Sequence, residues 1–136
     1  MSRVVLDSGP LIALLNPNDP RHRHCRDWFA SFDGEMILPA PVLTEVCWHL
    51  ESWPDIEAAF VRSAARGEFT LVELDAALLE RAADLVAQYR DFPLGSTDAS
   101  VIAIAERFSV REIATLDHRH FRAIRPQHIE AFALVP

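Results

Sequence analysis

Short apolar runs alternate with longer stretches of helical periodicity along the chain. Aliphatic and β-branched runs predict strands at residues 4–6, 36–38, 69–72 and 113–116, and a weaker run predicts a fifth near 131–135. Between them, apolar positions three and four residues apart predict helices over 11–15, 20–32, 42–50, 54–65, 78–90 and from residue 97 onward. The chain therefore reads as strands separated by helices.

Polar residues and breakers mark the ends of several of these helices. Asp19 followed by Pro20 is typical of an N-cap with proline at the first helical position. Asp75 and Thr97 are predicted to cap the two later helices, and Gly67 is predicted to end the helix that starts at Pro54.

Strands separated by helices require crossover connections, so we expect an α/β fold with a mostly parallel sheet covered on both faces. With 136 residues, half of them hydrophobic, the chain is expected to form one domain over residues 1–136. Ligands of such sheets bind outside the carboxyl ends of the strands. Asp7 and Asp117 both directly follow predicted strands, and they lie near each other if those strands are neighbours.

Composition narrows the class of protein further. The net charge is −7, and all thirteen basic residues are arginine. The absence of lysine excludes P-loop nucleotide hydrolysis and Schiff-base chemistry, which both need a lysine amine. Two cysteines are too few for a disulfide scaffold, and no apolar run approaches the roughly 20 residues of a membrane span. We expect a cytoplasmic protein without a membrane segment.

Four acidic residues are candidates for a common site. Asp7 and Asp117 follow predicted strands, Asp98 begins a helix after a glycine-containing loop, and Glu45 projects from its helix away from the apolar face. If they converge, their charges repel, and a hard divalent cation is the natural counter-charge in a chain without lysine. Each acid alone also fits a simpler role: a turn residue, a helix cap or a solvated side chain.

Three segments together resemble the PIN-domain ribonucleases, and more narrowly the VapC-type toxins of type II toxin-antitoxin systems. They are Asp7-Ser8-Gly9-Pro10-Leu11-Ile12-Ala13-Leu14-Leu15, then Leu94-Gly95-Ser96-Thr97-Asp98-Ala99-Ser100-Val101-Ile102-Ala103, and Thr115-Leu116-Asp117-His118-Arg119-His120-Phe121. Glu45 lies between them, in the helix after the second strand. The resemblance spans nearly the whole chain, in the family's order.

The resemblance implies a PIN-like α/β/α sandwich that cuts RNA with a metal-activated water. Carried over residue by residue, it places the metal-binding and catalytic acids at Asp7, Glu45, Asp98 and Asp117, holding one or two Mg²⁺ ions, with Mn²⁺ as the alternative. Ser8 and Thr115 match positions that support the site by hydrogen bonding, and Asp91 matches a supporting acid more loosely.

The resemblance also implies partners: an RNA substrate, a cognate antitoxin, a homodimer and larger toxin-antitoxin complexes. Arg119 and Arg122 are predicted at the RNA rim, and Arg21, Arg23 and Arg26 form a second basic group. A solvated face is the alternative interpretation of both groups. Trp28, Trp48 and Trp53 are interpreted as packing residues or as part of a partner surface.

Three other hypotheses fit parts of the sequence. An aspartyl-phosphate enzyme would use Asp7 as nucleophile, but the receiver and HAD classes also need a lysine. A zinc site from His22, His24, Cys25, Cys47 and His49 lacks the usual ligand spacing. A catalytically inactive PIN module that binds RNA or a protein partner remains the alternative to the nuclease.

Overall fold

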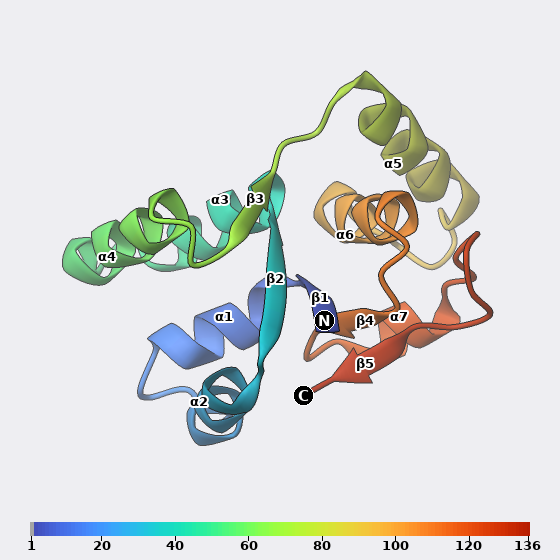
Figure 1. The fold of residues 1–136 in the computed structure, drawn as a ribbon. Coiled ribbons are helices and arrows are strands. Elements are labelled where there is room, and N and C mark those ends of the chain that lie inside the picture. The colour runs from blue at the N-terminus through green and yellow to red at the C-terminus, as the bar shows by residue number, and fades with distance from the viewer. Residues whose placement is uncertain (1) are drawn as a thin grey trace.

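The computed structural model describes residues 2–136 and contains a five-stranded sheet, with all strands parallel, in the order β3-β2-β1-β4-β5 (Figure 1). The strands are β1 (Ser2–Leu6), β2 (Gly34–Pro39), β3 (Thr70–Val72), β4 (Glu112–Ala114) and β5 (Ala133–Val135). The helices are α1 (Ser8–Leu15), α2 (His22–Ser31), α3 (Ala40–His49), α4 (Pro54–Ala65), α5 (Ala76–Gln88), α6 (Ser96–Arg107) and α7 (His118–Ala123). The expected parallel α/β architecture is confirmed.

The central strand β1 pairs with β2 on one side and β4 on the other. Leu6, its last residue, is in register with Ala114, the last residue of β4. The amide of Asp7 then donates to the carbonyl of Ala114 at 2.9 Å. Because both strands end at the same edge, the residues that follow them are brought side by side.

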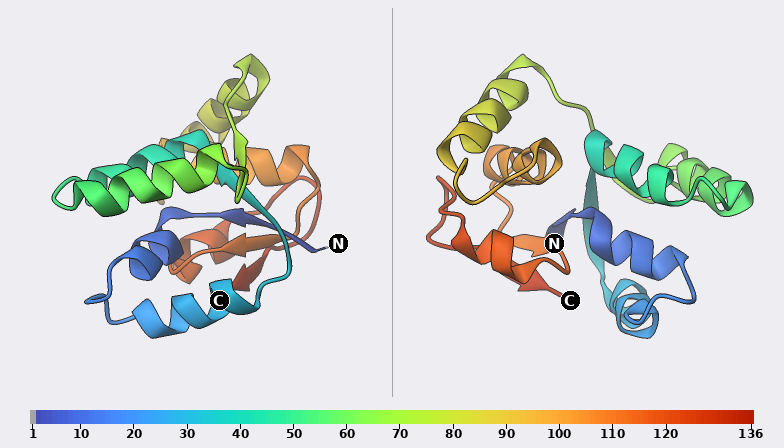
Figure 2. Two further views of the ribbon diagram at one scale, coloured as in Figure 1. Left: turned by 60° about the vertical axis from the view of Figure 1, so that its left-hand side comes forward. Right: turned by 180° about the vertical axis from the view of Figure 1, so that it is seen from behind.

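The core lies around β1 and α6. Val4, Val5 and Leu6 are fully buried, and residues 99–105 of α6 are buried on every side of the helix. A helix that is apolar all round belongs in the interior. The views in Figures 1 and 2 place β1 and β2 between α1 and α2 on one side and α5 and α6 on the other, which is the layered arrangement of an α/β/α sandwich.

One glycine is required by the close pairing of β1 and β2. Gly34 faces Ser2 in the parallel register, and a Cβ built on Gly34 would lie 2.2 Å from the carbonyl oxygen of Ser2. Any side chain at residue 34 therefore has to push the two backbones apart.

Most predicted helix ends are confirmed, but two N-termini are wrong. Helix α2 begins at His22, not Pro20, because Asp19 accepts the amide of Arg21 at 2.8 Å in a turn instead of capping the helix. Helix α6 begins at Ser96 with Gly95 at the N-cap, so Thr97 lies inside the first turn. Asp75 does cap α5, accepting the amide of Leu78 at 2.9 Å.

The short helix α7 was not predicted, and the fourth strand ends at Ala114, not at residue 116. Phe121 is the one buried residue of α7, so the segment carries no apolar periodicity. Within residues 2–136, no helix combines the length and the apolar composition that a membrane crossing requires.

Candidate active site

The ends of two neighbouring strands position the first pair of acids. Asp7 follows β1 and is the N-cap residue of α1, while Asp117 lies after β4 and is the N-cap residue of α7. Asp98 lies in the first turn of α6, and Glu45 lies in α3, which follows β2. All four therefore come from elements at the carboxyl ends of β1, β2 and β4 or from the helix that packs against these strands.

Asp7 is held in a defined orientation by Thr115. The Thr115 hydroxyl donates to Asp7 Oδ2 at 2.8 Å and accepts the amide of Asp117 at 2.9 Å. Thr115 is fully buried and Asp7 is 6% exposed. Burial raises the pKa of Asp7, the Thr115 hydroxyl and the Ser8 amide lower it, and the charges of Glu45 and Asp117 raise it.

The pKa of Asp98 reflects the charges of the other three acids. Its pKa is raised to about 7, first by burial and then by the negative charges of Asp7 and Asp117, with a smaller contribution from Glu45. The nearby His120 lowers the pKa of Asp98. The charges of Asp7, Asp117 and Glu45 therefore act on Asp98, in agreement with the placement of all four acids on elements at the carboxyl ends of the strands.

Ser8 connects Glu45 to the same edge. Its hydroxyl donates to Glu45 Oε1, and its residue immediately follows Asp7. Ser8 itself is 8% exposed, so this hydrogen bond is shielded from water. Ser8 and Thr115 thus both make the supporting hydrogen bonds that were predicted, each to one of the acids.

Asp117 has a partner that was not predicted. His120 Nδ1 lies 2.6 Å from Asp117 Oδ2, and the His120 amide donates to Asp117 Oδ1 at 3.2 Å. The Phe92 ring packs on His120 with 4.8 Å between centroids, and the guanidinium of Arg119 lies 5.9 Å from the Phe92 centroid. The i, i+3 spacing of Asp117 and His120 could have indicated the first contact, but nothing in the sequence indicated Phe92.

The remaining predicted residues lie further out. Asp91 is exposed in the turn before Phe92, and it is not among the charges that act on Asp7 or Asp98 within residues 2–136. Arg122 is exposed on α7 and Arg119 is exposed beside Phe92. Arg119 lines a common hollow with Asp117, whereas the hydrogen bonds and ion pairs of residues 2–136 link neither Arg122 nor Asp91 to the four acids.

The donor set suits a hard divalent cation. All the candidate ligands are carboxylate oxygens, and burial, followed by the neighbouring negative charges, raises the pKa of both Asp7 and Asp98. Across residues 2–136, no three His, Cys, Asp or Glu side chains stand together as a ready coordination shell. Ser8 contacts one oxygen of the Glu45 carboxylate, and His120 contacts both oxygens of the Asp117 carboxylate.

The three tryptophans divide between the two predicted roles. Trp28 packs against the core, stacked on Phe32 at 5.1 Å and edge-on to Phe29 at 4.8 Å. Trp48 and Trp53 are 66% and 50% exposed at the end of α3 and before α4. Only these two are available to a partner.

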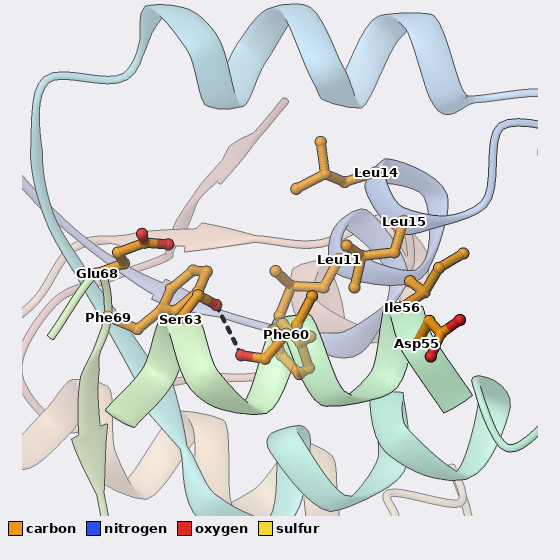
Figure 3. A pocket seen from close by; sticks show the side chains of 10 residues that line it. Leu11, Leu14, Leu15, Asp55, Ile56, Phe60, Ser63, Glu68 and Phe69 are labelled. Carbon is orange, nitrogen blue, oxygen red and sulfur yellow. Dashed lines mark hydrogen bonds between the residues drawn. The ribbon is translucent and has the colours of Figure 1, made fainter. Parts of the chain in front are cut away.

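An apolar groove lies between α1 and α4, away from the four acids. Figure 3 shows Leu11 and Leu15 of α1 facing Phe60 and Ile56 of α4, and Leu14 completes the lining on the far side of α1. Asp55 and Glu68 lie at opposite ends of this row of apolar side chains. The groove encloses about 450 Å³, a volume within the usual range for binding clefts.

A family model for the PIN domain matches residues 4–125. The chain belongs to the PIN-domain family. Ribonuclease VapC26 of Mycobacterium tuberculosis is 30% identical to this PIN domain over 135 residues, which is 98% of this chain and the whole of the relative. The resemblance to PIN-domain and VapC proteins is thereby confirmed.

Solved structures show the same fold. The crystal structure of Mycobacterium tuberculosis VapC20, described as a sarcin-ricin loop cleaving toxin, has a TM-score of 0.70 and 21% identity, covering 81% of this PIN domain and 86% of that chain. A chain of a toxin-antitoxin complex from Klebsiella pneumoniae has a TM-score of 0.71 and 18% identity, covering 89% and 92%. The PIN-like α/β/α sandwich is confirmed.

Proposed function

We propose that this PIN domain is a metal-dependent endoribonuclease and the toxin of a toxin-antitoxin pair. The observation that carries the proposal is the electrostatic convergence of Asp7, Glu45, Asp117 and Asp98 at one edge of the sheet. Similarity over its full length to a relative named as a ribonuclease supports RNA as the substrate. Similarity in fold to a chain of a toxin-antitoxin complex supports the toxin role.

The chain's own residues prepare the acids for this reaction. Thr115 fixes the buried Asp7 carboxylate with one oxygen turned toward the hydroxyl, so the other oxygen is left for a cation. Ser8 keeps Glu45 at the same edge, and His120 holds Asp117. The burial of Asp7 and Asp98 keeps water away from the carboxylates and strengthens their interaction with a cation.

We propose Mg²⁺ as the cofactor, with Mn²⁺ able to replace it, held by Asp7, Asp98, Glu45 and Asp117. When bound, such an ion activates the attacking water and stabilises the charge that develops on the phosphate. Four carboxylates carry a charge of about −4, which suffices to compensate two divalent ions.

RNA cleavage by the purified protein tests the proposal. We expect the unaltered chain to cut RNA with Mg²⁺ and to lose this activity with EDTA. Asp98→Asn is expected to lower the rate at least a hundredfold. Asp33→Asn is the matched control, because Asp33 is an exposed acid at the start of β2, at the opposite edge of the sheet. RNA that is bound but not cut with Mg²⁺ or Mn²⁺ would instead favour the catalytically inactive module.

The antitoxin is proposed to occupy the groove between α1 and α4. Its lining of leucine, isoleucine and phenylalanine fits the apolar face of a partner helix. Asp55 and Glu68 at the two ends favour a segment flanked by lysine or arginine. Such a partner is needed because an unregulated ribonuclease would damage its own cell.

The chain is also proposed to form a homodimer and larger complexes with the antitoxin, and to work in the cytoplasm. Trp48 and Trp53 supply exposed aromatic surface for contacts in a homodimer and in larger complexes with the antitoxin. The cytoplasm, where RNA is abundant and thiols stay reduced, suits a chain whose two cysteines, Cys25 and Cys47, are both free.

A further inference from the structure

A polar hollow beside Asp117 is lined by two basic groups that are far apart in the sequence. Arg21 and His24 come from the turn before α2 and from its first turn, while His118 and Arg119 come from the start of α7. Asp117 is itself part of the lining, so the hollow opens directly beside the acids. About a hundred residues of sequence separate the two groups, and only the fold brings them together.

The side chains that line this hollow carry more positive than negative charge, although the whole chain is acidic. The protein has a net charge of −7, yet the side chains of the lining contribute two guanidinium groups against one side-chain carboxylate, that of Asp117. Within residues 2–136, neither Arg21 nor Arg119 has a carboxylate within ion-pair distance, whereas Arg81 and Arg107 are held by Glu106 and Asp75. Two free guanidinium groups facing one cavity form a suitable site for an anion.

The size and the remaining lining suit a nucleotide better than a free ion. The hollow encloses about 620 Å³, within the range of small-molecule clefts. Leu116 and Pro136 add apolar surface to the lining, which an inorganic anion would not use but a ribose or a base can contact. The ring of Phe92 lies under Arg119 and limits how far this guanidinium can move from the hollow.

We propose that this hollow binds the nucleotide adjacent to the cleaved bond, with Arg21 and Arg119 contacting its phosphate. The inference rests on the proposed ribonuclease function and extends it, because it names where the RNA continues beyond the acids. Arg21 belongs to a basic group that the sequence left unconnected to the site. The hollow makes it a substrate-binding residue.

Binding of a labelled pool of short single-stranded RNA of random sequence tests the proposal. The protein carries Asp98→Asn so that the RNA stays intact, and affinity is measured by fluorescence anisotropy with Mg²⁺ over a range of salt concentrations. Adding Arg21→Ala should weaken binding about tenfold and reduce the slope of log K against log salt by about 0.7, the value for one phosphate contact on a single strand. Arg119→Ala should behave likewise, and Arg21→Lys should retain most of the slope.

Arg111→Ala is the control, because Arg111 is an exposed arginine that precedes β4 and lies at the opposite edge of the sheet. It should change affinity less than twofold.

If Arg21→Ala matches Arg111→Ala in both affinity and slope while its thermal unfolding is unchanged, the hollow is not an RNA site. The unaltered chain is assayed in parallel for cleavage, so that a failure of the nuclease proposal is seen separately. With cleavage intact, Arg21→Ala should raise KM and leave kcat unchanged.

Discussion

The Thr115 hydroxyl donates a 2.8 Å hydrogen bond to Asp7 Oδ2 and joins two residues that are 108 positions apart. Both are buried at the point where the neighbouring strands β1 and β4 end. The same hydroxyl accepts the amide of Asp117. One small side chain therefore fixes the positions of two of the four acids relative to each other.

Replacing Thr115 by valine should weaken metal use without unfolding the protein. Valine keeps the shape but removes the hydroxyl that orients Asp7 and lowers its pKa. Loss of such a supporting hydrogen bond typically costs about 10- to 100-fold in metal affinity or activity. A Mg²⁺ titration of RNA cleavage measures the effect, with Thr115→Ser as the variant that keeps the hydroxyl. Equal Mg²⁺ dependence of the valine variant and the unaltered chain would show that the hydrogen bond has no role in the site.

The raised pKa of Asp98 predicts how the stability of the metal-free protein depends on pH. The pKa is about 7 in the folded state, against an ordinary value of 3.8. Between these values the folded state keeps a proton that the unfolded state has released. The free energy of unfolding should therefore fall as the pH rises from about 4 to about 7, by at most about 1.4 kcal/mol for each pH unit.

Urea unfolding in EDTA at about pH 5 and about pH 7.5 measures this dependence. Asp98→Asn should show a smaller decrease than the unaltered chain and should be the more stable of the two at the higher pH. Asp33→Asn, which alters an exposed acid, should keep the original decrease. An unchanged decrease in Asp98→Asn would mean that this carboxyl is not under strain from its neighbours.

Gly34→Ala should destabilise the fold strongly. The added methyl group would lie 2.2 Å from the Ser2 carbonyl oxygen, and a backbone atom within a paired strand cannot move aside cheaply. We expect a loss of about 3 kcal/mol in the free energy of unfolding, measured in urea. Gly95→Ala is the matched control, since nothing lies within 4 Å of its added Cβ, and it should cost less than about 1 kcal/mol. Equal effects of the two variants would contradict the close approach of β1 and β2.

A substitution in the groove between α1 and α4 should affect antitoxin binding without affecting RNA cleavage. Leu14→Glu places a charge in the apolar lining and should abolish a stable complex with the antitoxin, while RNA cleavage by the free protein persists. Leu79→Glu is the control, because Leu79 is 54% exposed on α5, outside the groove. Co-expression with the antitoxin, followed by size-exclusion chromatography, measures the complex. A complex that tolerates Leu14→Glu would place the antitoxin elsewhere.

The sequence was most informative where a local rule decides the structure. Pro54 and Gly67 set the ends of α4, and Asp75 caps α5, because each acts on its immediate neighbours. The same rules were misleading at Asp19, whose carboxylate accepts the amide of Arg21, one residue before the helix begins at His22. Propensity could not decide between a cap and a turn at that position.

In the candidate site, too, the sequence identified some residues, while others are recognised only from the fold. Motif resemblance identified the four acids together with Ser8 and Thr115, but the adjacency of β1 and β4, on which their meeting depends, is a property of the sheet order. His120 and Phe92 were not identified as neighbours of the acids, because α7 and the turn before α6 meet only in the folded chain. The same holds for Arg21, which reaches the site through the position of α2.

Mn²⁺ binding followed by electron paramagnetic resonance tests the central claim most directly, because free and bound Mn²⁺ are distinguished without any RNA. The unaltered chain should bind one or two ions at neutral pH. Asp7→Asn and Asp98→Asn should each weaken binding at least tenfold, while Asp33→Asn should bind as the unaltered chain does. If the chain binds no Mn²⁺, or binds it equally well without either aspartate, the four carboxylates do not form a metal centre.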